Sequence, residues 1–282
     1  MKDLIPHIIQ SFFPKSFLVL LLVSGSCTEK IDWDLDYQEV DVMVVEGKIT
    51  SETMAHEVHL SWPVYEVNTL PEPVSGAVVE INDGREIHSL TEDASRPGTY
   101  LTDPSFSGEV NRGYQLRIQY EGKRISAIAF MAEVLPFPDM SVYPVQTDPP
   151  LFEAYISDQN GPSVIRLELD WSNVPGYDTL PPEDSHALIY HYTLGTVDVN
   201  HIFAPERERV QFPPGTIVIR EKESVSREYE EFLRGMLSET DWRGGVFDVL
   251  PGNARTNLNG DAIGYFTAAD VIRDTLTVLR GQ

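Results

Sequence analysis

The chain contains one cysteine, no long apolar run and few basic residues. Because Cys27 is the only cysteine among 282 residues, no disulfide can form within the chain, and an apolar core must hold the fold. The uninterrupted apolar segment at residues 17–23 is about a third of the ~20 residues that a membrane-spanning helix requires. With 21 Lys and Arg against 44 Asp and Glu, the formal net charge is −23. Such a chain repels phosphate backbones, so we exclude nucleic acid as a partner.

The single cysteine follows the apolar segment and three small residues, Ser24, Gly25 and Ser26. Small side chains beside a thiol are typical of a bacterial lipoprotein signal, since the peptidase cuts next to the residue that will carry lipid. We therefore expect residues 1–26 to be a signal peptide and Cys27 to be lipidated. Several acyl chains on one residue would attach the protein stably to a membrane through its N-terminal lipid.

Two alternatives exist for this cysteine. Residues 1–26 could be a plain secretory signal followed by an unrelated cysteine, or Cys27 could be a buried free thiol of the mature fold. Bacterial lipoprotein signals usually place leucine three residues before the cysteine, whereas Ser24 stands there. The position of the only cysteine at the cleavage-site end of the signal favours lipidation.

The stretch that follows the cysteine is acidic. Three aspartates alternate with other residues between positions 32 and 36, a spacing that resembles the start of an EF-hand calcium loop. The resemblance fails afterwards, because Tyr37 stands where the loop needs glycine and Met43 stands where it needs a bidentate glutamate. We interpret residues 27–38 as a solvated acidic tether and expect no metal site there.

From residue 39 the pattern is that of β-strands. Residues 114–120 alternate Tyr, Leu, Ile and Tyr with Gln, Arg and Gln, which is the period of a half-buried strand. Turn residues separate this segment from similar ones. The others are residues 42–49, 58–62, 77–81, 86–90, 99–102 and 124–131. We expect an immunoglobulin-like β-sandwich over residues 39–134.

Prolines crowd residues 135–150, which excludes a helix or a central strand, and we place a linker between two domains there. The second domain, residues 151–282, is expected to be β-rich and to carry one helix near residues 226–238. Ser226 can cap that helix, whose apolar residues fall on one stripe at helical spacing. Its strands are expected at residues 164–171, 187–193, 216–220 and 275–279. The fold class is therefore mainly β.

No motif for catalysis, a cofactor or a metal emerges from the chain. His56 and His59 are three apart in a strand pattern, so their side chains point to opposite faces and do not form a zinc site. His186, His191 and His201 have no second ligand at a suitable spacing. We expect neither an enzyme nor a bound cofactor.

Three short stretches resemble carboxypeptidase-regulatory-like and transthyretin-like modules. They are residues 73–79, 97–100 and 113–117. This resemblance concerns the fold alone and implies an immunoglobulin-like sandwich in the N-terminal part.

A wider resemblance covers nearly the whole mature chain. It is carried by residues 44–49, 102–108, 245–257 and 260–266. With these segments the chain resembles a family of Bacteroidota outer-membrane lipoproteins known only as a domain of unknown function, whose members are commonly encoded beside TonB-dependent receptors. The resemblance implies an outer-membrane location, a TonB-dependent receptor as partner, and export to the cell surface through the acidic residues Glu29, Asp32 and Asp34.

We expect from these observations a surface-exposed, non-catalytic accessory or binding subunit of a TonB-dependent transporter. An adhesion or matrix-contact module and a hydrolase with dispersed catalytic residues are the alternatives. Glycine- and asparagine-rich loops are common binding positions, so we expect the partner to contact the tail of the chain. The residues expected to form this partner loop are Pro251, Gly252, Asn253, Asn257, Gly260, Asp261, Tyr265 and Phe266.

Overall fold

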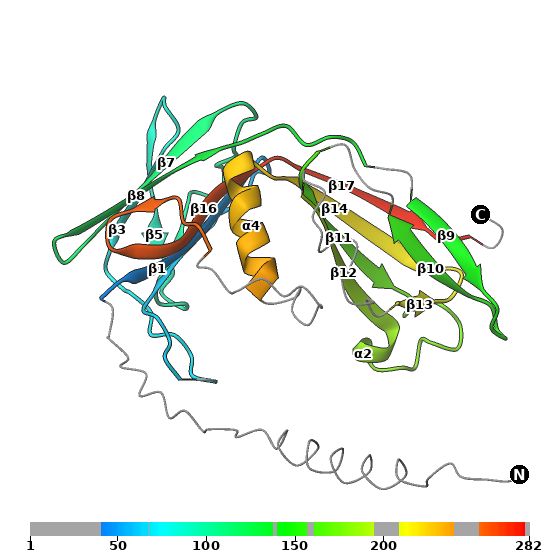
Figure 1. Ribbon diagram of the computed structural model, residues 1–282. Helices are drawn as coiled ribbons and strands as arrows, with labels where there is room; N and C mark the ends of the chain where they lie inside the picture. Colours follow the sequence, from blue (N-terminus) through cyan, green and yellow to red (C-terminus); the bar gives the residue numbers. More distant parts are fainter. Residues whose placement is uncertain are drawn as a thin grey trace, which may run out of the picture. The chain divides into compact units, whose positions relative to one another are not determined.

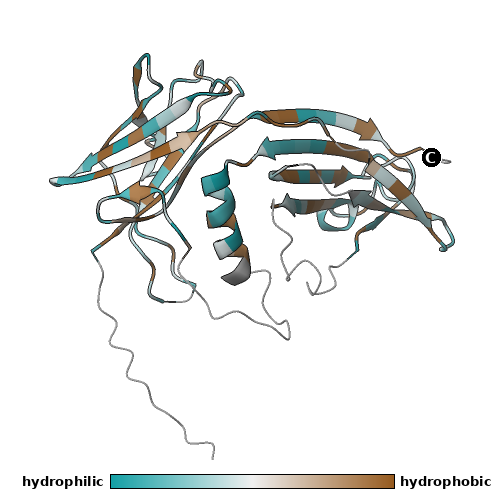
Figure 2. Ribbon diagram, turned by 45° about the horizontal axis from the view of Figure 1, so that its top comes forward, coloured by the Kyte–Doolittle hydropathy of each residue, from teal (hydrophilic) through white to brown (hydrophobic). Residues whose placement is uncertain are grey.

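The computed structural model describes residues 41–66, 68–137, 140–156, 161–194, 209–239 and 254–279, and these form a mainly β fold (Figure 1). This confirms the fold class expected from the sequence. Among the described residues, the strands form four sheets. Figure 2 shows the alternation of hydrophilic and hydrophobic residues as changes of colour along the strands.

Two five-stranded sheets enclose the first core. The first sheet has the order β16-β1-β2-β6-β5 and the second the order β15-β8-β7-β3-β4. Alternate residues of both sheets point inward, and Val45, Leu60, Ile81 and Leu116 are among those that are completely buried. The strands of the first sheet are β1 (Met43–Thr50), β2 (Glu57–Ser61), β5 (Thr91–Glu92), β6 (Thr99–Leu101) and β16 (Ala262–Ala269). Those of the second are β3 (Val78–Asn82), β4 (Ile87–Ser89), β7 (Gly113–Tyr120), β8 (Lys123–Phe130) and β15 (Leu258–Asn259).

The first core is completed by a strand from the far end of the chain. β16 pairs with β1 in parallel, with Met43 opposite Ala262 and Thr50 opposite Ala269. The two backbones approach so closely at Gly264, which has a φ of 102°, that a Cβ there would collide with the carbonyl oxygen of Val45. The domain division predicted from the sequence differs from this arrangement, because that division assigned all of residues 151–282, including β16, to a second domain.

The second core lies between the two remaining sheets. Phe152 and Phe212 from one sheet and Ile165, Leu167 and Leu169 from the other are buried together. The first of these sheets contains β13 (Gln211–Phe212), β10 (Leu151–Ile156) and β9 (Met140–Val145). The second contains β12 (His186–Thr193), β11 (Ser163–Asp170), β14 (Ile217–Ser224) and β17 (Val271–Thr277). The short helix α2 (Pro182–Ser185) precedes β12.

β9 lies within the stretch that was expected to be a linker without regular structure. It pairs only with β10 in the described sheet and carries Pro144. A proline cannot donate a hydrogen bond to a neighbouring strand, so an edge position is where it is tolerated. The prediction excluded a central strand correctly but missed the edge strand.

Helix α4 (Arg227–Glu239) forms where the sequence predicted it. The backbone amide of Tyr229 donates to the Oγ of Ser226 at 3.2 Å, which is the expected N-terminal cap. Phe232 packs against Tyr265 of β16 with ring centroids 4.7 Å apart, and Leu233 is buried. The apolar stripe therefore packs on strand residues, and Figure 1 shows α4 beside β16.

Hydrogen bonds fasten residues 132–137, which connect β8 with β9, to β14 and the start of β17. The Oγ of Ser224 donates to the carbonyl oxygen of Ala132 at 2.7 Å and accepts from the amide of Asp270 at 2.9 Å. The amide of Val134 donates to the carboxylate of Asp270 at 3.0 Å. These contacts fix the path of the chain where it leaves the first core.

Candidate functional site

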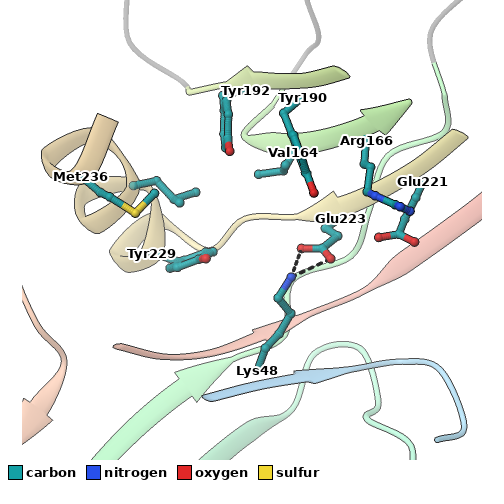
Figure 3. A pocket seen from close by; sticks show the side chains of 10 residues that line it. Lys48, Val164, Arg166, Tyr190, Tyr192, Glu221, Glu223, Tyr229 and Met236 are labelled. Atoms are coloured by element: carbon teal, nitrogen blue, oxygen red, sulfur yellow. Dashed lines mark hydrogen bonds and ion pairs between the residues drawn. The ribbon is translucent and has the colours of Figure 1, made fainter. Parts of the chain in front are cut away.

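A cleft of about 220 Å³ lies between helix α4, one face of the β12-β11-β14-β17 sheet and Lys48 of β1 (Figure 3). The helix contributes Tyr229, Leu233 and Met236, which succeed one another at helical spacing on one side. Their side chains provide an apolar and aromatic wall.

The sheet contributes the opposite wall through residues that its register places on one face. Val164 lies opposite Tyr192 on β12 and opposite Glu223 on β14. Two residues along, Arg166 lies opposite Tyr190 and Glu221. Directly paired residues of neighbouring strands point to the same side, so these six side chains gather on the face away from the second core.

Ion pairs organise the charged side chains of this wall. The ammonium of Lys48 donates to both carboxylate oxygens of Glu223, at 2.8 and 2.7 Å. The guanidinium of Arg273 donates to Glu221 at 2.7 Å and also contacts Glu52 at 3.0 Å. Both glutamates of the cleft are therefore held by cations from neighbouring strands.

Three tyrosines give the cleft its aromatic character. Tyr190 and Tyr192 stack with centroids 6.3 Å apart and an interplanar angle of 20°. Tyr229 stacks on Phe232 at 5.9 Å and 14°. Burial raises the pKa of the Tyr229 hydroxyl, and the nearby carboxylate of Glu223 acts in the same direction, so this phenol stays neutral and can donate a hydrogen bond.

The chemistry of this lining suits non-covalent binding. Among the described residues that line the cleft, none is a serine, threonine, cysteine or histidine. Its two carboxylates, Glu221 and Glu223, lie side by side on the same strand, whereas glycoside hydrolysis uses carboxylates that face one another across the scissile bond.

A hydroxyl, a histidine and a carboxylate do line up elsewhere, at the base of β12. The Oγ of Ser185 lies 3.0 Å from Nδ1 of His186, whose Nε2 lies 3.2 Å from the carboxylate of Asp170. Ser185 is only 1% exposed, and its hydroxyl also lies 3.3 Å from the carbonyl oxygen of Pro181. A buried hydroxyl cannot reach a substrate carbonyl, so this arrangement is better explained as a set of contacts that stabilises the junction between α2 and β12.

A second arrangement of this kind lies on the outer face of the first sheet. The Oγ1 of Thr99 is 3.0 Å from Nδ1 of His59, and Nε2 of His59 is 2.9 Å from Glu57. Thr99 is 3% exposed, and Glu57 is bound by both terminal nitrogens of Arg96 at 3.1 and 2.7 Å. Hydrogen bonding to Arg96 lowers the pKa of Glu57, which marks this cluster as a surface ion-pair network.

The two histidines that could suggest zinc do not converge. His56 is buried against Phe106, and its ring contacts backbone groups of Thr50 and Glu52. His59 points to the other side, as expected from the strand pattern. Within the part of the chain that the structure describes, no three potential ligands form a metal-binding group.

The structure places part of the expected partner loop in a strand. Tyr265 and Phe266 belong to β16 and are buried, because the ring of Tyr265 contacts Tyr229 and Phe232 of α4 and Phe266 lies in the first core. The side-chain amide of Asn257 bridges two strands by donating to the carbonyl oxygens of Ile128 and Phe266 at 2.9 and 2.7 Å. Gly260 and Asp261 form the exposed turn that leads into β16.

The remaining predicted positions lie outside the described residues. They are Cys27, Glu29, Asp32 and Asp34 near the N-terminus, Pro251, Gly252 and Asn253 in the tail, and His201. No helix in the described ranges is long and apolar enough to cross a membrane.

Sequence reasoning did not find the cleft. Its residues come from β1, β11, β12, β14 and α4, so no local motif joins them. The available signal was the exposed face of the predicted strand at residues 187–193, on which Leu188, Tyr190 and Tyr192 alternate with inward residues. Tyrosines on the solvent face of a strand are candidates for binding, since they present large contact area with a polar tip.

The fold and the cleft define a mainly β protein with a tyrosine-lined, ion-paired recess on the face of a sheet. The chain belongs to the family described as a domain of unknown function, DUF4249, which matches residues 28–275. The expected membership of a family known only as a domain of unknown function is thereby confirmed. No curated protein matches the chain.

Proposed function

We propose that this protein is a lipid-anchored, non-catalytic binding subunit of the bacterial outer membrane that associates with a TonB-dependent receptor. The cleft between α4 and the β12-β11-β14-β17 sheet is the observation that carries the binding role. It presents three tyrosines, aliphatic side chains and paired charges to a ligand, and its described lining contains no serine, threonine, cysteine or histidine. The anchor rests on the sequence around Cys27, and the receptor rests on the family resemblance.

The anchor is tested by changing the only cysteine. In cells supplied with radiolabelled palmitate, the wild-type protein should take up label and fractionate with the outer membrane, whereas Cys27→Ser should do neither. The serine variant removes one sulfur atom and keeps the size of the side chain. Label in Cys27→Ser would show that lipid is attached elsewhere or not through this signal.

The surface location is tested by protease added to intact cells. The wild-type protein should be digested, and a variant with alanine at Glu29, Asp32 and Asp34 should stay protected in the periplasm. Lysis before digestion provides the control, since both proteins should then be cleaved. Protection of the wild type in intact cells would contradict export to the surface.

The partner is tested by gentle detergent extraction, affinity capture and mass spectrometry. Tyr190→Ala removes a cleft side chain that is 44% exposed, and Tyr143→Ala removes one on β9 that is 56% exposed. Both changes spare the cores, so stability should be similar in the two variants. We expect Tyr190→Ala to reduce recovery of the receptor and Tyr143→Ala to leave it unchanged.

Two outcomes would overturn this proposal. Equal recovery with both tyrosine variants would remove the cleft from the interaction. Recovery of the protein alone, together with hydrolysis of a peptide or glycan that is lost when a single acidic residue or serine is changed, would establish the hydrolase instead.

A further inference from the structure

The connection between β2 and β3 forms a closed loop that projects beyond the first sheet. Its base is fixed where Ser61 bridges Pro73, and the amide of Trp62 donates to the carbonyl oxygen of Glu72 at 2.8 Å. Pro63 and Pro71 follow directly on the two sides, and each restricts the backbone. The base of the loop is thereby held closed.

This tip exposes large apolar side chains. Leu70 is 89% exposed, Tyr65 46% and Val64 42%. Single exposed apolar residues are ordinary, but several on one short loop form a patch that marks a contact surface. The proline-flanked base means that these side chains are not folded back onto the sheet.

The base of the loop contains residues that suit a membrane interface. Trp62 packs partly on the first core, with Tyr120 at 6.3 Å in an edge-to-face arrangement. The ammonium of Lys123 lies 5.2 Å from the centre of the Trp62 ring. Tryptophan, tyrosine and lysine are enriched at the level of lipid headgroups, where a ring or an aliphatic stem meets apolar surface and the polar end meets water.

The loop lies at the end of the sheet where the described chain begins. β2 runs antiparallel to β1, so Ser61 at the start of the loop pairs with Val44. Lys123 ties this end together, since its ammonium donates to the backbone oxygen of Asp41 at 3.1 Å and pairs with the carboxylate of that residue. The chain that leads to Cys27 therefore leaves the first core beside the loop.

The length of the tether limits how far this end can lie from the lipid. Asp41 lies fourteen positions after Cys27, and an extended chain spans at most ~3.6 Å per position, so the separation is at most about 50 Å. Confinement by the anchor raises the effective concentration of the loop at the membrane, so even a weak apolar contact becomes populated. Figure 1 shows the start of β1 in blue, close to the beginning of the described chain.

We propose that the loop of residues 62–66 and 68–73 is a second membrane contact, which inserts Leu70 and Val64 into the acyl-chain layer of the leaflet that carries the N-terminal lipid. This inference rests on the proposed lipid anchor. The occupant is the acyl-chain region of that leaflet, because Glu66, Glu72 and the negative net charge oppose attraction to anionic headgroups. The contact would fix the orientation of the first sheet relative to the membrane.

Site-specific spin labelling of the full-length protein tests the contact. If Cys27 carries lipid, the wild-type protein has no thiol for a nitroxide label, and each introduced cysteine is labelled alone. The protein is purified from outer membranes and reconstituted into vesicles of phosphatidylcholine and phosphatidylethanolamine. Leu70→Cys and Val64→Cys report on the loop, and Leu188→Cys on β12, also an exposed leucine position, is the matched control.

Labels at positions 70 and 64 should lose most of their relaxation by a water-soluble nickel chelate and gain relaxation by oxygen, while the label at position 188 stays accessible to the chelate. If the loop labels behave as the control does, and the wild type takes no label, the loop contact is wrong and the anchor stands. If the wild-type protein itself takes label at Cys27, the proposed anchor fails, and the loop contact falls with it.

Discussion

The two cores of this molecule differ in what closes them. The first has a large apolar cluster that is completed by Phe266, which β16 brings from near the C-terminus to the side of β1. The second core is apolar around Leu167 and Phe152. On the same face of the sheet this core is bounded by Lys222, which is buried and lies between Ile165 and Ile272 of the neighbouring strands. The first core should therefore be sensitive to side-chain volume, and the second to the pairing of polar groups.

The buried polar groups of the second core have a definite location. The ammonium of Lys222 donates to the carbonyl oxygen of Pro136 at 3.0 Å, and Arg220 lies 4.5 Å above the ring of Phe137. Arg220 is itself bound by Asp274 through its Nε at 2.6 Å. These residues hold the segment that leaves the first core, so polarity in the second core serves to position the junction between the two.

The largest effect is expected in the first core. Phe266→Ala removes a completely buried ring that lies beside Gly47, its partner on β1, so we predict a loss of about 3–5 kcal/mol in the free energy of unfolding. Phe130→Ala, an exposed phenylalanine on β8, is the control and should change stability little. Chemical denaturation of both variants measures the difference. Equal stabilities would mean that β16 does not complete the core.

A smaller effect is expected where the junction is hydrogen-bonded. Ser224→Ala removes a buried hydroxyl and leaves the oxygen of Ala132 and the amide of Asp270 without this partner, so we predict a loss of about 1–3 kcal/mol. Ser89→Ala on the exposed edge strand β4 is the matched control. Denaturation curves of the two variants should separate clearly. A neutral Ser224→Ala would show that the junction is held by other contacts.

The buried lysine predicts a dependence of stability on pH. Burial lowers the pKa of Lys222 below its usual value of 10.5. Between the folded and the unfolded pKa the unfolded chain binds more protons, so the free energy of unfolding should rise as the pH increases through that window toward 10.5. Lys222→Met keeps the length of the side chain and removes the titrating group.

The wild type should therefore gain stability relative to Lys222→Met as the pH is raised through the window below 10.5. Urea denaturation at several pH values measures this difference, and other titrating groups cancel because both proteins share them. A difference between the two proteins that does not change with pH would show that the lysine titrates normally in the folded state. The burial of Lys222 would then not make the stability of the second core depend on polar groups in the way that distinguishes it from the first.

Elements whose apolar and polar residues recur at a regular spacing were predicted from the sequence, and elements without such a pattern were missed. Residues 114–120 alternate and form most of β7, and the capped stripe after Ser226 forms α4. β16 is buried along most of its length between the helix and the core, so its residues show no period of two, and its glycines favoured a loop. Its parallel pairing with β1 joins segments more than 200 residues apart, and no local pattern specifies such a contact.

The candidate site was beyond sequence reasoning for the same reason. Lys48 and Glu223 are 175 residues apart in the chain, and their pairing depends on the order of the sheets. The sequence does contain the charged and aromatic residues on strand faces that form the walls of the cleft. The pairing register of the strands decides on which face of the sheet these residues gather.

The smallest effect concerns the ion pair of the cleft that joins β1 of the first core to β14 of the second. Lys48 is 43% exposed at its side chain, and exposed ion pairs contribute roughly 0.2–1 kcal/mol, so we predict a coupling of that size between Lys48→Met and Glu223→Gln in a double-mutant cycle. The coupling should shrink when the salt concentration is raised to 1 M, because the Debye length then falls to about 3 Å.

The pair of Arg273 with Glu221, which lies within one sheet, is the matched control and should show coupling of similar size. If Lys48 and Glu223 couple by several kcal/mol and salt has no effect, the pair is a buried lock between the two cores. The cleft would then be rigidly closed on that side, which would argue against a recess that opens to receive a ligand.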